Sequence, residues 1–446
     1  MSEQQSTTQL KRVLGFGDLM AIAIGYTIGA GIMSLTGIAI GMTGRSVPLS
    51  FLISSLLFLI MVVPLVLING TVRLRGGTYT QMALLAGKRL AGISVFMGFF
   101  INIAIALYAL SFADYFLALV PGVNRQLIAI ICLTIFFVIN LVGVEGAAKM
   151  EAVMVLVMLA AIIVYIVFGL FKVQPGVVSG SDFMPGGVTG MFGAAALLTF
   201  ATGGSQILTS LGAEAKNPVK DIPIAMITST LLVAVLYALM GVVASGVLPL
   251  AKVANQPLNL VAKEIMPMPL YVFFIIGGAM LALTTTLNAT FSAGTKPILQ
   301  ACDDGWFPKW LGAVNKKFKT PHVLLTIFFL FGLFVILTGL NMEAIANYFV
   351  ILNLVINVVI CAVTVRLPKV LPEMWAKSKF KVSAGWLWVI SILSALICVV
   401  QVALLASRLQ TRDLLIILGI IIVSIVYTIL RDRSGKVQMQ VSHEES

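Results

Sequence analysis

The chain has 446 residues, of which 60% are apolar and only 10% charged, with a mean hydropathy of +1.07 and a formal net charge of +12. A water-soluble fold cannot bury that much apolar surface and a disordered chain has the opposite composition, so we expect a protein that lies in a lipid bilayer. The charge does not indicate nucleic-acid binding, because the basic residues punctuate apolar runs, as in loops at an anionic membrane surface.

Apolar runs follow one another along most of the chain. A helix needs roughly 20 apolar residues to cross the hydrocarbon core. On that basis we predict an all-α integral membrane protein with twelve transmembrane helices, over residues 16–42, 47–70, 90–119, 124–142, 148–171, 188–213, 223–247, 270–301, 321–338, 342–365, 383–406 and 412–430. We expect the polar tails, 1–15 and 431–446, to carry no soluble domain.

The distribution of Lys and Arg predicts the orientation. If both termini lie inside, the inner segments hold 22 of the 29 basic residues and the outer loops hold 7. Because basic residues are enriched in cytoplasmic loops, this bias predicts an even number of spans in the cell membrane, with both termini cytoplasmic.

Two of the predicted spans carry glycine-rich interruptions near their middles, Gly25–Gly31 in span one and Phe200–Gln206 in span six. Each glycine weakens a helix by about 1 kcal/mol relative to alanine. In lipid the freed backbone groups must also find partners. Either interruption alone is equally explained by close helix packing through small residues.

The position of the two interruptions suggests a repeat. Each falls in the first helix of a possible five-helix unit, 16–171 and 188–365, with two extra helices in 383–430. Because five is odd, the second unit would enter from the opposite side, which gives a 5+5 inverted repeat with discontinuous helices one and six. Interrupted helices expose N–H and C=O groups, which complement the carboxylate and ammonium of an amino acid.

Three motifs carry a resemblance to a known family. They are Gly29-Ala30-Gly31 in span one, Gly212-Ala213-Glu214-Ala215-Lys216-Asn217-Pro218 with Asp221-Ile222-Pro223 after span six, and Asp303-Asp304-Gly305-Trp306-Phe307-Pro308 with Asn315 and Thr320-Pro321-His322 after span eight. In these the chain resembles the amino acid–polyamine–organocation transporters, closest to their neutral amino acid permease and exchanger branches. The resemblance covers essentially all twelve spans and implies an amphipathic helix within Gly76–Gly87.

The resemblance implies a substrate site built mainly from backbone groups. N–H groups around Gly29, Ala30 and Gly31 would bind the substrate carboxylate. Carbonyl groups would bind the ammonium, near Tyr26 and Thr27 and from Ala201, Thr202 and Gly203. Phe200 matches the family's aromatic lid over the substrate, and an ordinary core aromatic is the alternative. Gln206 stands where some relatives carry a glutamate thought to sense protons, so we expect that proton route to be absent.

Span eight carries Ala282, Thr285 and Thr286 on one helix face. In sodium-coupled members of the fold, the matching positions bind Na⁺ together with carbonyls that would here be Gly25 and Ile28. Oxygen ligands suit a hard cation. The alternative is that the hydroxyls bond back to the preceding turn. Sodium-independent relatives often place a lysine where this chain has Met158, so the site is expected to be empty or to hold Na⁺, and coupling to H⁺ stays open.

Charged residues are scarce inside the spans. Asp114 lies toward the outer end of span three. It is equally explained by a contact with the substrate and by a polar partner or water at the rim of the membrane. No charge lies at the level of the interruptions, where a cationic substrate would require a carboxylate or several aromatics. Charged residues at the inner ends of spans have two possible roles. They either set the orientation of the spans as solvated ends, or form a cytoplasmic gate of ion pairs that break and re-form during transport. These residues are Arg73, Arg75, Glu145, Lys149, Glu151, Glu214, Lys216 and Lys220.

The sequence therefore predicts a secondary active transporter that moves small neutral amino acids by alternating access, as an exchanger or an ion-coupled symporter, in a monomer or homodimer. The alternative is a cationic amino acid or polyamine carrier. A channel is disfavoured because no span shows a filter or a charged ring. An enzyme is disfavoured because the two histidines, His322 and His443, lie outside mid-span positions and no catalytic or nucleotide-binding motif occurs.

Overall fold

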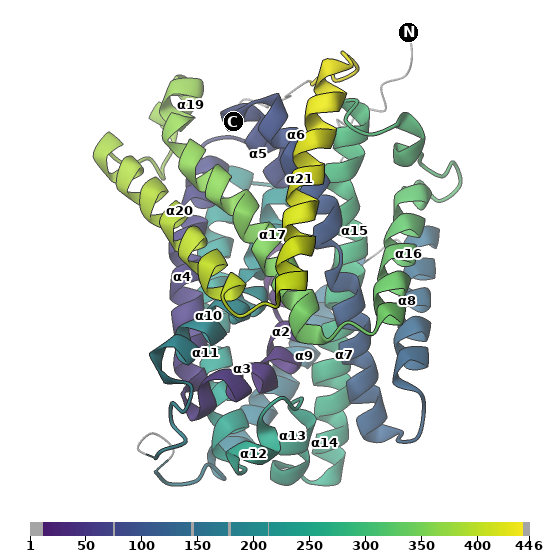
Figure 1. The fold of residues 1–446 in the computed structure, drawn as a ribbon, viewed down its shortest axis with the longest axis vertical. Helices are drawn as coiled ribbons and strands as arrows, with labels where there is room; N and C mark the ends of the chain where they lie inside the picture. Colours follow the sequence, from purple (N-terminus) through teal and green to yellow (C-terminus); the bar gives the residue numbers. More distant parts are fainter. Residues whose placement is uncertain (1–11, 75, 144–146, 177–179, 213, 440–446) are drawn as a thin grey trace.

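The computed structural model describes residues 12–74, 76–143, 147–176, 180–212 and 214–439. These residues form a long bundle of helices without a β-strand among them (Figure 1). Their one isolated bridge joins Leu14 to Ala215 in parallel. The prediction of an all-α fold is confirmed.

The first half of the chain forms nine α-helices in the described residues, eight of them in the first five predicted spans and α5 between spans two and three. They are α1 (Phe16–Thr27), α2 (Ala30–Met33), α3 (Leu35–Thr43), α4 (Val47–Asn69), α5 (Gly77–Ala86), α6 (Lys88–Ile101), α7 (Ala104–Leu119), α8 (Arg125–Val142) and α9 (Ala147–Leu170). The first three form span one, and α6 and α7 form span three. The short α5 occupies the segment where the family resemblance implied an amphipathic helix.

The second half of the chain continues the bundle. It comprises α10 (Gly187–Thr202), the 3₁₀ segment η3 (Gly203–Leu211), α11 (Pro218–Gly246), α12 (Leu250–Val253), α13 (Asn259–Ile265), α14 (Met268–Phe273), the π-helix η4 (Phe274–Met280), α15 (Leu281–Asp303), α16 (His322–Thr338), α17 (Met342–Val363), α18 (Leu367–Val370), α19 (Pro372–Lys377), α20 (Ala384–Ala406) and α21 (Thr411–Arg433). Short 3₁₀ turns lie at Gly44–Ser46, Lys309–Gly312 and Thr364–Arg366.

The helices account for the twelve predicted spans. In the described part of the chain, eleven helical segments are long and apolar enough to cross a membrane, and α16 is a shorter apolar helix. One helix start differs clearly from the predicted start of its span: α11 begins at Pro218, whereas span seven was predicted to begin at residue 223. Proline is well tolerated in the first turn of a helix, and Pro218 takes that place while Pro223 lies inside the helix.

Span three contains an interruption that the sequence analysis did not predict. The N–H groups of Asn102 and Ile103 donate to the carbonyls of Phe99 and Phe100, three residues back, over 3.3 and 3.1 Å. The side-chain Nδ2 of Asn102 donates to the carbonyl of Gly98 over 3.0 Å. An asparagine side chain competes with the helix for backbone groups, which explains why α6 ends here.

The interrupted spans form the centre of the bundle. In span six 72% of the residues of its apolar stretch are buried, against 17% in α8 and in α21. Large apolar side chains on the outer helices are exposed, such as Leu396 on α20 and Leu415 on α21. An apolar exterior of this kind is expected where lipid replaces water. We call the end of the bundle that carries α5, α19 and the end of α21 the tail end, at the top of Figure 1, and the end with α3, α12 and α13 the far end.

Candidate functional site

Span one stops being helical over two residues. α1 ends at Thr27, Ile28 is extended with φ −82° and ψ 100°, and Gly29, with φ −155° and ψ −141°, precedes α2. The first N–H groups of a helix have no partner within it. Among the described backbone hydrogen bonds, none is donated by Gly29, Ala30 or Gly31. The interruption therefore presents buried backbone donors, as a site for a carboxylate requires.

Span six is interrupted in a different way from the one predicted. α10 ends at Thr202, and the chain continues as the 3₁₀ segment η3 instead of unwinding. The N–H of Gly203 still donates to the carbonyl of Thr199, four residues back. A mid-span change from α to 3₁₀ pairing keeps most carbonyls bonded, so fewer acceptors are released than in an extended break.

The two interruptions lie directly against each other. A Cβ placed on Gly31 would lie 2.4 Å from the Cα of Ala201, and one placed on Gly204 would lie 2.4 Å from the Cα of Thr27. Only glycine permits backbones to approach this closely. The hydroxyl of Tyr237 donates to the carbonyl of Thr27 over 2.8 Å, so this predicted acceptor for the ammonium already has one donor.

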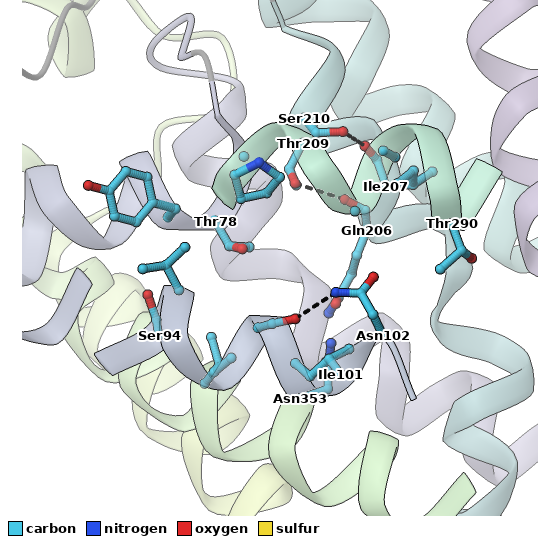
Figure 2. Close-up of a pocket in the computed structure, with 18 of the residues that line it drawn as sticks. Thr78, Ser94, Ile101, Asn102, Gln206, Ile207, Thr209, Ser210, Thr290 and Asn353 are labelled. Atoms are coloured by element: carbon cyan, nitrogen blue, oxygen red, sulfur yellow. Dashed lines mark hydrogen bonds between the residues drawn. The ribbon is translucent and has the colours of Figure 1, made fainter. Parts of the chain in front are cut away.

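A cavity of about 190 Å³ extends from the interruptions toward the tail end (Figure 2). Tyr26 and Gly203 line its inner part, and Thr78 and Tyr79 of α5 line its other part. It therefore joins the mid-span level to the end of the bundle where α5 lies.

Uncharged polar side chains line this cavity. Figure 2 shows Asn102, Gln206 and Thr290, which come from three different elements, around the same space. Gln206 Nε2 donates to Asn357 Oδ1 over 3.3 Å, and Asn357 Nδ2 donates to Asn353 Oδ1 over 2.6 Å. Among the described residues, no Asp, Glu, Lys or Arg lines the cavity.

A smaller cavity of about 40 Å³ adjoins the first and shares Tyr26 and Gly203 with it. Phe200 lines it and is 8% exposed. The Phe200 ring lies 4.7 Å from that of Phe349, edge to face, and 5.9 Å from that of Tyr108. These three rings form an aromatic cluster beside the interruptions, which we call the aromatic lid.

The predicted substrate residues thus fall into two groups. Tyr26, Phe200 and Gly203 line the cavities, whereas the remaining members are not among the described lining residues: Thr27, Gly29, Ala30, Gly31, Ala201 and Thr202. Sequence reasoning named Phe200 and Gln206 but missed the other amides of the lining, Asn102, Asn353 and Asn357, and the rings of Tyr108 and Phe349. A usable signal existed for the amides, because asparagine and glutamine inside apolar spans are costly and often functional. Tyr108 and Phe349 carried no distinguishing signal.

The residues predicted for a cation site come together around one hydroxyl. Thr286 Oγ1 lies 3.4 Å from the carbonyl oxygens of Gly25 and of Ile28, and 2.8 Å from that of Ala282. Thr285 Oγ1 lies 2.9 Å from the same Ala282 oxygen. The donor set is all oxygen, which suits Na⁺. The short bond to Ala282, one turn back, also matches the alternative of a hydroxyl bonded to its own helix.

Ion pairs lie at both ends of the bundle. At the tail end, Lys296 Nζ on α15 lies 2.7 Å from Glu214 Oε1 in the connection after span six. The gate hypothesis included Glu214 but not Lys296. At the far end, Arg125 Nη2 donates to Asp114 Oδ2 over 2.8 Å, which gives Asp114 a partner at the rim. Of the other gate candidates, Arg75 and Glu145 lie outside the described residues, as do the side chains of Lys149 and Glu151.

The tail-end mouth of the larger cavity is braced by a buried hydrogen bond. The Tyr79 hydroxyl donates to Asp304 Oδ2 over 2.6 Å. Burial, and secondly the negative charge of Asp304, raise the pKa of Tyr79, so its hydroxyl keeps the proton that it donates. This bond ties α5 to the segment that follows α15.

Comparison with known proteins identifies relatives of the whole bundle. A family model described as amino acid permease matches residues 14–426. The chain is 28% identical to the branched-chain amino acid permease BcaP of Bacillus subtilis, over 70% of this chain and 72% of the relative. It is 27% identical to a methylthioribose transporter of Bacillus subtilis, over 72% and 74%. It is 27% identical to cationic amino acid transporter 1 of Arabidopsis thaliana, over 71% and 56%.

Proposed function

The chain belongs to the amino acid permease family, and we propose that it moves small neutral amino acids across the membrane by alternating access. As a member of that family it is a multi-pass membrane transporter and not an enzyme. In this proposal the protein works as an exchanger or as an ion-coupled symporter. It lies in the cell membrane with the tail end cytoplasmic.

The proposal of a neutral substrate rests on one observation: the described lining of the larger cavity contains no charged side chain. A guanidinium or ammonium side chain in a buried cavity loses its hydration and needs a counter-charge or several aromatic faces. The amide and hydroxyl groups of Asn102, Asn353 and Thr290 supply no counter-charge, and the three rings of the aromatic lid pack against one another instead of lining the cavity with free faces. The relatives do not decide the matter, because their printed names include both branched-chain and cationic substrates.

The proposed binding mode uses both groups of predicted residues. The N–H groups of Ala30 and Gly31, at the start of α2, hold the carboxylate, and carbonyls near Tyr26 and Gly203 hold the ammonium. The substrate side chain then lies against the aromatic lid. Binding at the interruptions requires Gly31 and Ala201 to separate slightly, since their backbones are now in contact.

The position of the cavities supports the proposal of alternating access. The larger one extends toward the tail end, and the aromatic lid lies beside its inner part. In the proposed cycle the Lys296–Glu214 ion pair, which links span eight to the connection after span six, breaks and reforms as exposure changes. The proposed coupling ion is Na⁺, held by the oxygens around Thr286.

Ligand-dependent stability of the purified protein tests this proposal. A ligand at about one hundred times its Kd stabilises the folded state by about 2.7 kcal/mol, which raises Tm. Alanine, serine, leucine and phenylalanine would be compared with arginine, putrescine and methylthioribose. We expect one or more neutral amino acids to raise Tm and arginine and putrescine to leave it unchanged. A rise produced by arginine alone would replace the proposal with the cationic alternative.

A further inference from the structure

A separate cavity of about 370 Å³ lies at the tail end, away from the interruptions. Its wall combines the end of α4, the start of α11, the segment around the end of α19 and the residues just before α1. Six basic residues line it: Arg12, Arg73, Lys216, Lys220, Lys377 and Lys379. No Asp or Glu contributes to the part of this wall that the structure describes. We call this cavity the basic pocket.

Specific contacts hold the wall segments together. Ser378 Oγ donates to the carbonyl of Gly70 over 2.7 Å, and a Cβ on Gly70 would lie 2.6 Å from the ring of Phe380. On the opposite wall, the N–H of Lys216 donates to the carbonyl of Leu14 over 2.9 Å. These contacts hold the four chain segments together in two pairs, and the lysines that they carry are exposed.

Four lysines of the basic pocket have no carboxylate partner in the part of the chain that the structure describes. Among the described residues, Lys216, Lys220, Lys377 and Lys379 take part in no ion pair. Arg73 is only 8% exposed, and its Nε donates to the carbonyl of Gly212 over 2.9 Å. Like charges around a concave wall repel one another and create a strongly positive potential, which an anion relieves.

We propose that the basic pocket binds a phosphate ester, presented by the headgroup of an anionic phospholipid. Phosphate is the anion that lysine and arginine clusters recognise best, through charge-assisted hydrogen bonds. The pocket lies where α4 ends and α11 begins, and the ends of two spanning helices are at the level of lipid headgroups. Val219, Met374 and Phe380 add apolar surface to the wall, as the glycerol and upper acyl chain of a lipid require.

Native mass spectrometry of the detergent-solubilised full chain tests this proposal directly. The protein would be titrated with dioleoylphosphatidylglycerol, with dioleoylphosphatidylcholine, or with soluble glycerol 3-phosphate. The variants are K216Q/K220Q and K377Q/K379Q, which remove charge from opposite walls. The matched control is K316Q/K317Q, which removes the same charge from exposed residues in the connection before α16.

We expect wild type to bind phosphatidylglycerol in preference to phosphatidylcholine, and each pocket variant to lose about thirtyfold in affinity, since juxtamembrane lysines act additively on anionic lipid. The control variant should bind as wild type does. Equal binding of the two lipids, or an equal loss in the control, would overturn the site. Binding of glycerol 3-phosphate without any preference for phosphatidylglycerol would overturn the assignment to a lipid. None of these outcomes depends on the transported substrate.

Discussion

Gly31 and Ala201 meet where spans one and six change course, and a Cβ on Gly31 would lie 2.4 Å from the Cα of Ala201. The contact brings together two interruptions that are far apart in sequence. It also changes which substitution is informative. A larger residue at Gly31 would displace the backbone of span six, so its effect would report packing as well as binding. Residues that line the cavities give cleaner tests.

The first prediction concerns the aromatic lid. Phe200→Leu keeps an apolar side chain in the lid but removes the ring that faces Phe349 and Tyr108. We expect the affinity for a neutral amino acid to fall about fivefold, because an aromatic face contributes on the order of 1 kcal/mol beyond its area. Kd from ligand-dependent Tm shifts measures the loss. Phe274→Leu, at a buried aromatic outside both cavities, should leave Kd unchanged.

The second prediction concerns charge in the larger cavity. Asn353→Asp keeps the acceptor used by Asn357 Nδ2 and adds a carboxylate to the lining. We expect arginine to become a competitor for uptake, because a buried carboxylate supplies the counter-charge that a guanidinium needs. Asn341→Asp is the control on the same helix, since aspartate caps a helix as well as asparagine does. Arginine competition in wild type at the strength seen in the variant would contradict the prediction.

The third prediction concerns coupling. Thr286→Ala removes the hydroxyl at the centre of the oxygen cluster, and Thr286→Ser retains it. We expect stimulation of uptake by Na⁺ to be lost in the first variant and kept in the second. Thr284→Ala is the control, because within the described residues that hydroxyl bonds to the carbonyl of Leu281 and takes no part in the oxygen cluster. Uptake into wild-type vesicles that is equal in sodium and in choline would show that the cluster does not couple transport to Na⁺.

The fourth prediction concerns the ion pair at the tail end. Glu214→Gln and Lys296→Gln each break the pair, and the charge-reversed double variant E214K/K296E restores it. Because both side chains are partly exposed, we expect the free energy of unfolding to change by about 0–1 kcal/mol. The transport rate should change in each single variant and return toward wild type in the double variant. Glu214→Lys and Lys296→Glu complete the cycle, and effects of these two single reversals on the rate that simply add in the double variant would show that the pair does not act as a gate.

The spans were predictable because lipid imposes a simple length and composition rule on each helix. The interruption in span one was predictable for a related reason, since glycines such as Gly29 weaken a helix whose freed groups lipid cannot satisfy. The form of span six was not predictable. Whether a glycine pair such as Gly203-Gly204 unwinds or tightens to 3₁₀ pairing depends on the packing of neighbours, here Thr27.

The lining of the cavities was only partly predictable. Asn102 interrupts span three without any nearby proline, and its effect arises from side-chain hydrogen bonds to the carbonyls of Gly98 and Phe99. The partner of Glu214 was equally hidden, because Lys296 lies on a different span and nothing in the sequence aligns the two. Contacts between spans are set by helix packing, which a single sequence does not encode in a local pattern.

The most direct test of the central claim is uptake of radiolabelled alanine, leucine and arginine into proteoliposomes that contain the purified protein. Vesicles would be prepared with and without internal amino acid, in sodium or in choline. The charge-free cavity predicts saturable uptake of a neutral amino acid, inhibited by excess unlabelled neutral amino acid and unaffected by excess arginine. Saturable uptake of arginine without uptake of any neutral amino acid would contradict it.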